Sequence, residues 1–393
     1  MKLRQKILAL AAVTVTATAI AVLPMTTSSA AVACYPAWSA SQAYVGGGQA
    51  SYQGVNYQAK WWTQNENPAT HSGQWDVWAN QGACGGGTTP TTPPPTGPTN
   101  PPPAGKMAAA PYVYPGWGNP PAPSTITGQG VRAFTVAFVL ANGCNPVWDG
   151  EGGLTGGVHE SWINQAKAAG ASIVPSIGGW QGNKLGPNCA TPEALAGAYQ
   201  KVINTFNLKA IDIDIENYDE FENYTVADRI VSALGIIKRN NPGVTTILTF
   251  GTTTTGPNAH GIRLINQARA LNANVDIFTI MPFDFGGGAD MYTSTRNAAE
   301  GLKNQLKSTF GWNDQTAYAH MGISGMNGLS DQQEVTTPET WTRIRDYARS
   351  SGLARFTFWA VNRDRGCAGG GVVSTCSGIA QSDWEFSRIS AGF

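Results

Sequence analysis

Charged side chains are scarce in this sequence. They make up 13% of its 393 residues, with 25 of each sign, so the formal net charge at pH 7 is zero. Globular proteins usually carry about 25% charged residues. A nucleic-acid-binding protein needs a basic face, so we expect no nucleic-acid partner. The balance also gives no reason to expect a membrane surface or a charged substrate.

Sequence motifs that bind metals or dinucleotides are also lacking. The four histidines are scattered, and no Cys-His spacing typical of a metal site occurs. No Gly-x-Gly-x-x-Gly motif follows a first predicted strand, so a dinucleotide role lacks support. We therefore expect no metal and no cofactor. Tryptophan and glycine, in contrast, are abundant, with 13 and 47 residues, and exposed tryptophan is typical of surfaces that bind neutral sugars.

The amino-terminal 33 residues have the pattern of a secretory signal. Basic residues precede an apolar run over 7–23, and small residues follow. We expect cleavage after Ala30 or Ala33 and a secreted, extracellular protein. A membrane anchor is disfavoured because the run is short and no second span follows. Cleavage at Ala33 would expose Cys34, which leaves a lipoprotein as the alternative.

The six cysteines predict disulfides, since the expected compartment is oxidising. Six cysteines allow many connectivities, which the sequence alone does not decide. Pairing cysteines that lie within one predicted unit gives Cys34–Cys84, Cys144–Cys189 and Cys367–Cys376.

Residues 34–84 predict a small all-β module, because short β runs are separated by Gly and Asn. Trp61 and Trp62 are adjacent, so they cannot both face inward on a strand. Either one stacks on sugar rings or joins a partner, or both cap a very small core. The stretch Tyr57-Gln58-Ala59-Lys60-Trp61-Trp62 resembles the signature of carbohydrate-binding modules of families 5 and 12. The resemblance implies that Tyr57, Trp61 and Trp62 bind chitin.

Residues 85–106 are rich in Gly, Thr and Pro and predict an extended linker. Its 22 residues would reach roughly 70 Å at about 3.1 Å each. Such a tether suits an insoluble substrate, because a bound module raises the local concentration of the second domain.

Residues 107–393 alternate between β-type runs and helical patterns. The runs cover residues 110–115, 132–140, 172–177, 210–216, 245–250, 276–284, 317–324 and 356–362. Helical spacing of apolar residues covers 159–169, 192–204, 226–239, 261–271, 297–308 and 338–350. This order predicts an α/β fold, a (β/α)8 TIM barrel. A doubly wound open sheet is the alternative.

The stretch 208–216 carries the most unusual pattern in the chain. Isoleucines alternate with Asp212, Asp214 and Glu216, so all three acids share one face of a strand. Burying three like charges is costly unless protons or donors are shared. One interpretation is an edge strand whose acids face water. The other is a catalytic set, in which the two aspartates share a proton and charge crowding raises the pKa of Glu216.

This stretch resembles the Asp-x-x-Asp-x-Asp-x-Glu signature of glycoside hydrolase family 18, the chitinases and their relatives. Lys209 stands where the first acid is expected. Further motifs of the same family are Ser176-Ile177-Gly178-Gly179 after the third strand, Met281-Pro282-Phe283-Asp284 after the sixth, and Trp359 on the eighth. The whole chain is thus similar to a secreted bacterial chitinase with an amino-terminal chitin-binding module.

The resemblance implies retaining hydrolysis in which the N-acetyl group of the substrate is the nucleophile. Glu216 is the expected acid and base, Asp214 the group that holds the acetamido N–H, and Asp212 its partner. Ser176, Phe283 and Asp284 are further candidates for the sugar site, and Ser176 could instead hydrogen-bond an aspartate. Phe283 departs from the motif, whose tyrosine hydroxyl would hold the acetamido oxygen.

Aromatic residues predict a sugar-binding cleft. Trp359 is the expected floor of the sugar site, and Trp180, with Trp117 and Trp148, follows one of the first three strands. Tyr112 is interpreted as packing. We expect an endo-acting chitinase, since no large insertion precedes the eighth strand. We also expect a monomer. The alternatives are an endo-β-N-acetylglucosaminidase acting on N-glycans and an inactive chitin-binding lectin.

Overall fold

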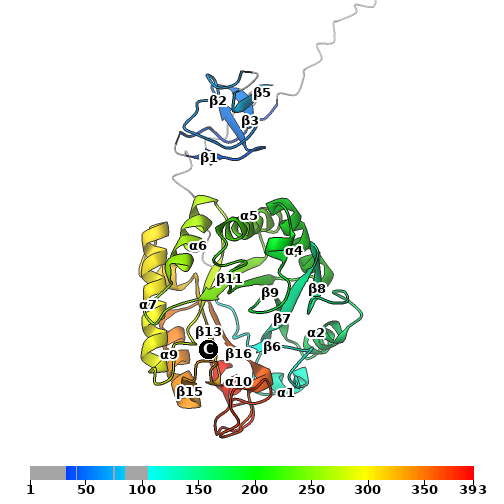
Figure 1. Ribbon diagram of the computed structural model, residues 1–393, viewed down its shortest axis with the longest axis vertical. Helices are drawn as coiled ribbons and strands as arrows, with labels where there is room; N and C mark the ends of the chain where they lie inside the picture. Colours follow the sequence, from blue (N-terminus) through cyan, green and yellow to red (C-terminus); the bar gives the residue numbers. More distant parts are fainter. Residues whose placement is uncertain (1–31, 41, 74–75, 85–104) are drawn as a thin grey trace, which may run out of the picture. The chain divides into compact units, whose positions relative to one another are not determined.

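The computed structural model describes residues 32–40, 42–73, 76–84 and 105–393. These residues form two compact units, one amino-terminal and one carboxy-terminal to the predicted linker. The predicted signal peptide and linker fall almost wholly outside the described residues. Figure 1 shows a small β unit and a larger unit in which helices surround a ring of strands.

The amino-terminal unit is a small all-β module. Its strands are β1 (Ala43–Tyr44), β2 (Gln49–Tyr52), β3 (Val55–Ala59), β4 (Thr63–Gln64) and β5 (Trp78–Ala83). An antiparallel sheet has the order β2-β3-β5, and β1 pairs with β4. The core holds only a few side chains, with Trp78 at its centre against Tyr44. The predicted Cys34–Cys84 disulfide is present and closes this unit. A core of this size needs such a crosslink.

The carboxy-terminal unit contains a parallel eight-stranded barrel. Its strands are β6 (Tyr112–Val113), β7 (Ala133–Asn142), β9 (Ser172–Gly178), β10 (Ala210–Ile215), β11 (Thr245–Gly251), β12 (Ile277–Met281), β13 (Met321–Met326) and β16 (Arg355–Trp359). The Ala110 N–H donates to the Phe356 carbonyl at 3.1 Å, which closes the ring beside β16. The predicted TIM barrel is therefore confirmed, and the open-sheet alternative is wrong.

Helices cover the outside of the barrel (Figure 1). They are α1 (Pro123–Thr127), α2 (Val158–Ala168), α3 (Leu185–Asn188), α4 (Pro192–Phe206), α5 (Tyr224–Asn240), α6 (Ala259–Ala270), α7 (Met291–Phe310), α8 (Asp314–Tyr318), α9 (Pro338–Ser351) and α10 (Glu385–Ser390). Thr191 and Thr337 cap α4 and α9 with their side chains, each followed by a proline at the first helical position. This placement costs nothing, because the first N–H groups of a helix lack intrahelical partners.

Residues 317–324 were expected to form one strand, and this boundary is wrong. Residues 314–318 form the short helix α8, whose first turn Asn313 caps, and β13 begins only at Met321. The remaining short elements are β8 (Asn145–Trp148), which forms a hairpin with β7, the pair β14 (Gly328–Leu329) and β15 (Val335–Thr336), and a 3-10 turn at Val361–Arg363.

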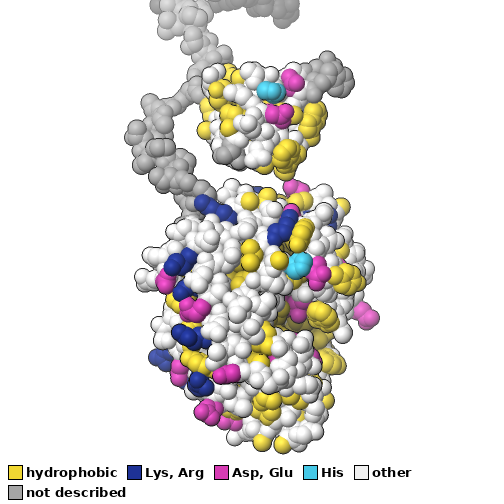
Figure 2. Space-filling model, turned by 60° about the vertical axis from the view of Figure 1, so that its left-hand side comes forward, with side chains coloured by type: hydrophobic (Ala, Val, Ile, Leu, Met, Phe, Trp, Pro, Cys, Tyr) yellow, Lys and Arg dark blue, Asp and Glu magenta, His cyan; other side chains and the backbone are white. Residues whose placement is uncertain are grey.

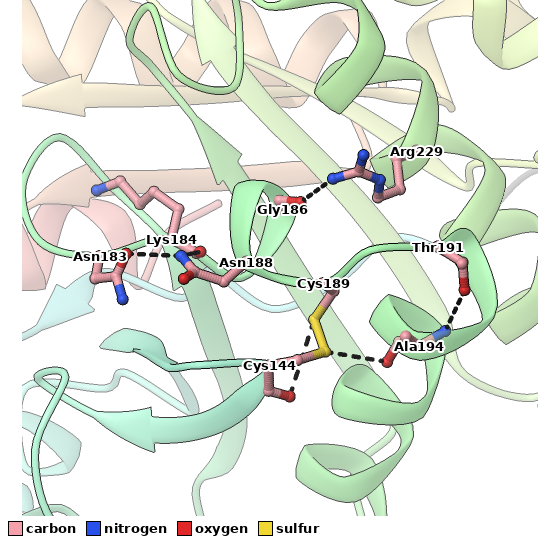
Figure 3. The surroundings of a disulfide bond; sticks show 9 residues. All are labelled: Cys144, Asn183, Lys184, Gly186, Asn188, Cys189, Thr191, Ala194 and Arg229. Carbon is pink, nitrogen blue, oxygen red and sulfur yellow. Dashed lines mark hydrogen bonds between the residues drawn. A yellow bond between two sulfur atoms is a disulfide. The ribbon is translucent and has the colours of Figure 1, made fainter.

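Two further predicted disulfides lie in this unit, Cys144–Cys189 and Cys367–Cys376. The first ties the β7–β8 hairpin to α3 (Figure 3). On the face that Figure 2 shows, uncharged atoms predominate, as the low charge content predicts, and basic and acidic side chains lie near one another along one side of the larger unit. Among the described helices, none is long and apolar enough to cross a membrane.

Candidate active site

Strand β10 places its acids inside the barrel. Its isoleucines face outward and are buried against the helices, while Asp212 and Asp214 face inward. Glu216 follows directly after the strand. Catalytic groups of TIM barrels lie at the carboxyl ends of the strands, so Glu216 is the acid nearest that face. The edge-strand interpretation is wrong, because β10 pairs with β9 on one side and β11 on the other.

Asp212 is the deepest of the three acids, and donors from four other strands surround it. Its Oδ2 accepts from the Tyr112 hydroxyl at 2.6 Å and from Ser176 Oγ at 2.9 Å. Its Oδ1 accepts from Thr249 Oγ1 at 2.6 Å and from Arg355 Nη1 at 3.1 Å. Both oxygens are therefore occupied. Arg355 is the cation that pairs with this carboxylate.

Asp214 lies one inward position higher and is poorly paired. The Tyr112 hydroxyl is 3.5 Å from its Oδ2, and its Oδ1 has no hydrogen-bond partner among the described residues. Its side chain is buried. Burial, followed by the charges of Glu216 and Asp212, raises the pKa of Asp214 well above its usual range. Asp214 therefore has an acceptor available and can hold a proton.

Glu216 borders a large cavity and has the pKa of an acid catalyst. Burial raises its pKa to about 7, the Lys184 ammonium opposes that shift, and the Asp284 and Asp212 carboxylates add to it. Charge crowding, the cause expected from the sequence, is thus smaller than burial. A carboxyl with such a pKa can donate a proton near neutral pH and take it back.

The cavity has a volume of about 1200 Å³ and is open to solvent. Among its lining residues are the predicted Asp214, Glu216, Asp284, Trp359, Phe283 and Trp180, together with Trp117, Ser324, Met281 and Met326. Trp359 is half-buried and stacks on Phe138, with ring centroids 5.5 Å apart. The rings of Trp117 and Trp180 are exposed. The cavity thus combines carboxyl groups with flat aromatic faces, a combination suited to sugars.

Three sequence-based interpretations need correction. Ser176 does not line the cavity, so its place in the sugar site is wrong, whereas its expected hydrogen bond to an aspartate is confirmed: it is fully buried and donates to Asp212. Trp148 does not extend the cleft, because it is buried and stacks on His159. Tyr112 is more than packing, since its hydroxyl bonds to Asp212.

Asp284 is tied to the β14–β15 segment across the cavity rim. Its backbone N–H donates to the Glu334 carboxylate, and its Oδ1 accepts from the Gln332 N–H at 3.3 Å. Burial, then the charge of Asp331, raises the pKa of Asp284. The side chain therefore both fixes the rim and faces the cavity.

The segment after β9 carries Trp180 and the buried Lys184. It is held by the Cys144–Cys189 disulfide and by Arg229, whose Nη1 donates to the Gly186 carbonyl at 2.8 Å (Figure 3). Lys184 Nζ donates to the Gln181 carbonyl. Its positive charge acts on Glu216 and Asp214, so the disulfide-bound segment supplies a cation to the site.

In the module, Trp61 and Trp62 are 48% and 60% exposed. Tyr57 is 5% exposed and belongs to the module core. Its expected place on the binding surface is therefore wrong, because alternation along β3 turns this ring inward. The two tryptophans remain as the aromatic surface.

Within the described ranges, no group of three or more His, Cys, Asp or Glu side chains could hold a metal ion. Sequence reasoning missed Arg355, Thr249 and Lys184. A lone basic or threonine residue in an apolar run gave no signal that it would meet Asp212 or Glu216.

Known proteins resemble both units of this chain. A family model described as "Carbohydrate-binding module family 5/12" matches residues 37–79. A probable bifunctional chitinase/lysozyme of Escherichia coli (strain K12) is 23% identical over 410 residues, covering 84% of this chain and 45% of the relative. The chain spans about half the length of the curated relatives it matches.

Solved structures share the fold of this chain. The catalytic domain of a hyperthermophilic chitinase from Pyrococcus furiosus is 26% identical with a TM-score of 0.67, covering 74% of this chain and 97% of that one. A family GH18 chitinase from Chromobacterium violaceum shares the fold at 17% identity, with a TM-score of 0.50, covering 92% and 99%. Fold, site and these likenesses together support a glycoside hydrolase. More particularly, the chain resembles chitinase catalytic domains, and its amino-terminal unit matches a family 5/12 carbohydrate-binding module.

Proposed function

We propose that this protein is a secreted chitinase that hydrolyses β-1,4 links between N-acetylglucosamine units. The observation that carries the proposal is Glu216, a carboxyl with a pKa of about 7 that borders an open cavity beside Asp214. The likeness to solved chitinases and the module with exposed Trp61 and Trp62 support chitin as the substrate. The three disulfides are compatible with an oxidising compartment.

In the proposed reaction, Glu216 gives its proton to the glycosidic oxygen as the bond from that oxygen to the anomeric carbon breaks. The acetamido oxygen of the same sugar forms the new bond to that carbon, which gives an oxazolinium ion. Asp214 accepts from the acetamido N–H and stabilises the positive charge. Water then attacks the anomeric carbon, Glu216 takes its proton, and the oxazolinium ring opens.

This scheme needs one acid/base carboxyl and a second carboxylate beside it, rather than two groups on opposite faces of the sugar. The stereochemistry at the anomeric carbon is retained, because inversion occurs twice. Proton NMR of the first product anomer tests this step: the β anomer supports the scheme, and the α anomer contradicts it.

The decisive variant is Glu216→Gln, which keeps the shape of the side chain and removes the proton donor. We expect hydrolysis of chitin oligomers to fall at least about 10²–10⁴-fold, the contribution of a general acid. Circular dichroism and binding to insoluble chitin should be unchanged. Turnover near that of the unmodified protein would overturn the assignment of Glu216.

Substrate choice and cleavage pattern need separate measurements. Products from chitin and from a high-mannose glycopeptide, compared at equal enzyme concentration, separate a chitinase from an endo-β-N-acetylglucosaminidase. Internal cleavage predicts early release of mixed oligomers from soluble chitin derivatives, and the open cavity supports this pattern. Release of a single short product from the start would contradict it.

A further inference from the structure

Several polar atoms near the cavity are left without a partner among the described residues, Asp149 Oδ1 and Arg363 Nη1 included. Two such groups lie on strands of the barrel. One is Asp214 Oδ1, an acceptor in a buried carboxyl. The other is the hydroxyl of Ser324, which reaches the same cavity and makes no hydrogen bond to the described residues. Buried polar groups are almost always paired in proteins. Two unmet groups beside one cavity therefore point to a bound molecule that pairs with both.

The barrel register places Ser324 close to the level of Glu216. Along the sheet, Ile215 pairs with Phe250, Phe250 with Ile280, and Ile280 with Ile323. One residue further along these strands lie Glu216, Gly251, Met281 and Ser324. All four follow outward-facing residues and so face the barrel interior.

The interior between these residues is open. A Cβ added to Gly251 would meet no atom within 4 Å. Met281 and Met326 line the cavity beside Ser324 and offer apolar contacts. A small group with one donor, one acceptor and a methyl would satisfy Asp214, Ser324 and the methionines together.

We infer that Ser324 donates its hydroxyl to the acetamido oxygen of the sugar whose bond is cleaved, while Asp214 accepts from the acetamido N–H. This inference rests on the proposed function and names the residue that orients the nucleophile of the substrate. An acetamide carries that N–H, that oxygen and that methyl. Phe283, which also lines the cavity, has no hydroxyl to offer.

Several other cavity donors are engaged, although Arg363 keeps its Nη1 without a partner among the described residues. The Tyr112 hydroxyl donates to Asp212, and the Tyr114 hydroxyl is bonded to Asp149. Arg363 donates to the carbonyls of Val373 and Leu329, which join the segments at the cavity rim. Ser324 differs because it lies on a barrel strand, as the acids do, and its hydroxyl is uncommitted.

The test compares Ser324→Ala with Ser324→Thr on chitotetraose. Loss of the hydroxyl should lower kcat about tenfold to a hundredfold, less than the roughly 10²–10³-fold lost with an oxyanion-hole donor. KM should rise severalfold, because the same hydroxyl contacts the bound substrate. The threonine variant should keep most of the turnover, because it keeps the hydroxyl. Ser161→Ala on the exposed face of α2 makes the same change away from the cavity and should have no effect.

The double variant Ser324→Ala with Phe283→Tyr asks whether a second hydroxyl can take over, and recovery of turnover would support the inference. Unchanged thermal unfolding of Ser324→Ala separates substrate orientation from a structural role. Equal kcat for Ser324→Ala and the unmodified protein would overturn the inference.

A binding measurement keeps this test independent of turnover. In the Glu216→Gln background, Ser324→Ala should weaken chitotetraose binding severalfold, read from tryptophan fluorescence. If the unmodified protein does not cleave chitotetraose, the proposed function fails, and this binding result still decides the role of Ser324. Unchanged affinity would reject the contact.

Discussion

Asp212 and Asp214 stand two residues apart on one strand, yet their surroundings are opposite. Tyr112, Ser176, Thr249 and Arg355 supply donors to both oxygens of Asp212. Asp214 has one long contact and one oxygen without a partner in the described chain. The lower layer of the barrel is thus a closed network, and the upper layer is left open. The same side chain is structural where donors saturate it and reactive where they do not.

The largest effect on stability is expected when Arg355, the cation of the lower layer, is replaced. Arg355→Met leaves Asp212 as a fully buried charge without its cation, and both side chains are fully buried. Breaking a buried pair by removing one partner typically costs about 3–5 kcal/mol. We expect the free energy of unfolding in urea to fall by that amount.

A second substitution serves as the control for Arg355. Adding Asp212→Asn removes the unbalanced charge and should restore part of the stability. The amide oxygen can still accept from Tyr112 and Ser176, and the amide NH2 can donate to the Thr249 hydroxyl, which then turns its own proton elsewhere. If Arg355→Met alone unfolds at the same urea concentration as the unmodified protein, the lower layer is not a charge network.

For Asp214, one layer higher in the barrel, we expect a loss of activity without a loss of stability. Asp214→Asn should lower kcat at least about 10²-fold, because a charge beside the developing cation is lost. The fold should not be weakened. The folded-state pKa of Asp214 is raised, so its ionisation opposes folding and this cost grows as pH rises through that pKa. The variant should therefore gain stability relative to the unmodified protein at alkaline pH, as measured by urea unfolding at pH 5 and pH 8. An equal loss of unfolding free energy at pH 5 and at pH 8 would contradict the contrast between Asp212 and Asp214.

Replacing Lys184 should have a smaller effect, a shift in the pH dependence of activity. Glu216 must be protonated to act as the acid, so kcat/KM should fall as pH rises through about 7. The Lys184 ammonium lowers the pKa of Glu216, whereas Asp284, Asp212 and Asp331 raise it. Lys184→Met should therefore move the alkaline limb of the pH profile to higher pH. Lys201→Met, an exposed lysine bonded to Asn145, is the matched control. An unshifted limb would exclude Lys184 as the tuning charge.

The module should contribute the smallest effect, and only on solid substrate. Replacing Trp61 and Trp62 with alanine should weaken binding to insoluble chitin severalfold, because stacking surface is lost. Activity on soluble tetramers should stay within experimental error. Equal loss on both substrates would mean that the two rings stabilise the module instead.

Much of the fold followed from local patterns. Eight β-type runs alternating with helices predicted the barrel, and proline or threonine at helix starts marked several boundaries. Cysteine positions within each unit predicted all three disulfides. The start of β13 was misplaced, because α8 is a short capped turn whose apolar content resembles a strand.

The sequence by itself determined that Asp212, Asp214 and Glu216 share one face, since the period of a strand is fixed by its backbone. Only the tertiary structure decided which acid is saturated and which is free. Arg355 and Tyr112 lie 143 and 100 residues from Asp212 along the chain. Barrel closure brings them within hydrogen-bonding distance, and no local pattern encodes such contacts. The pKa of Glu216 is likewise set chiefly by burial, which exists only once the barrel has formed.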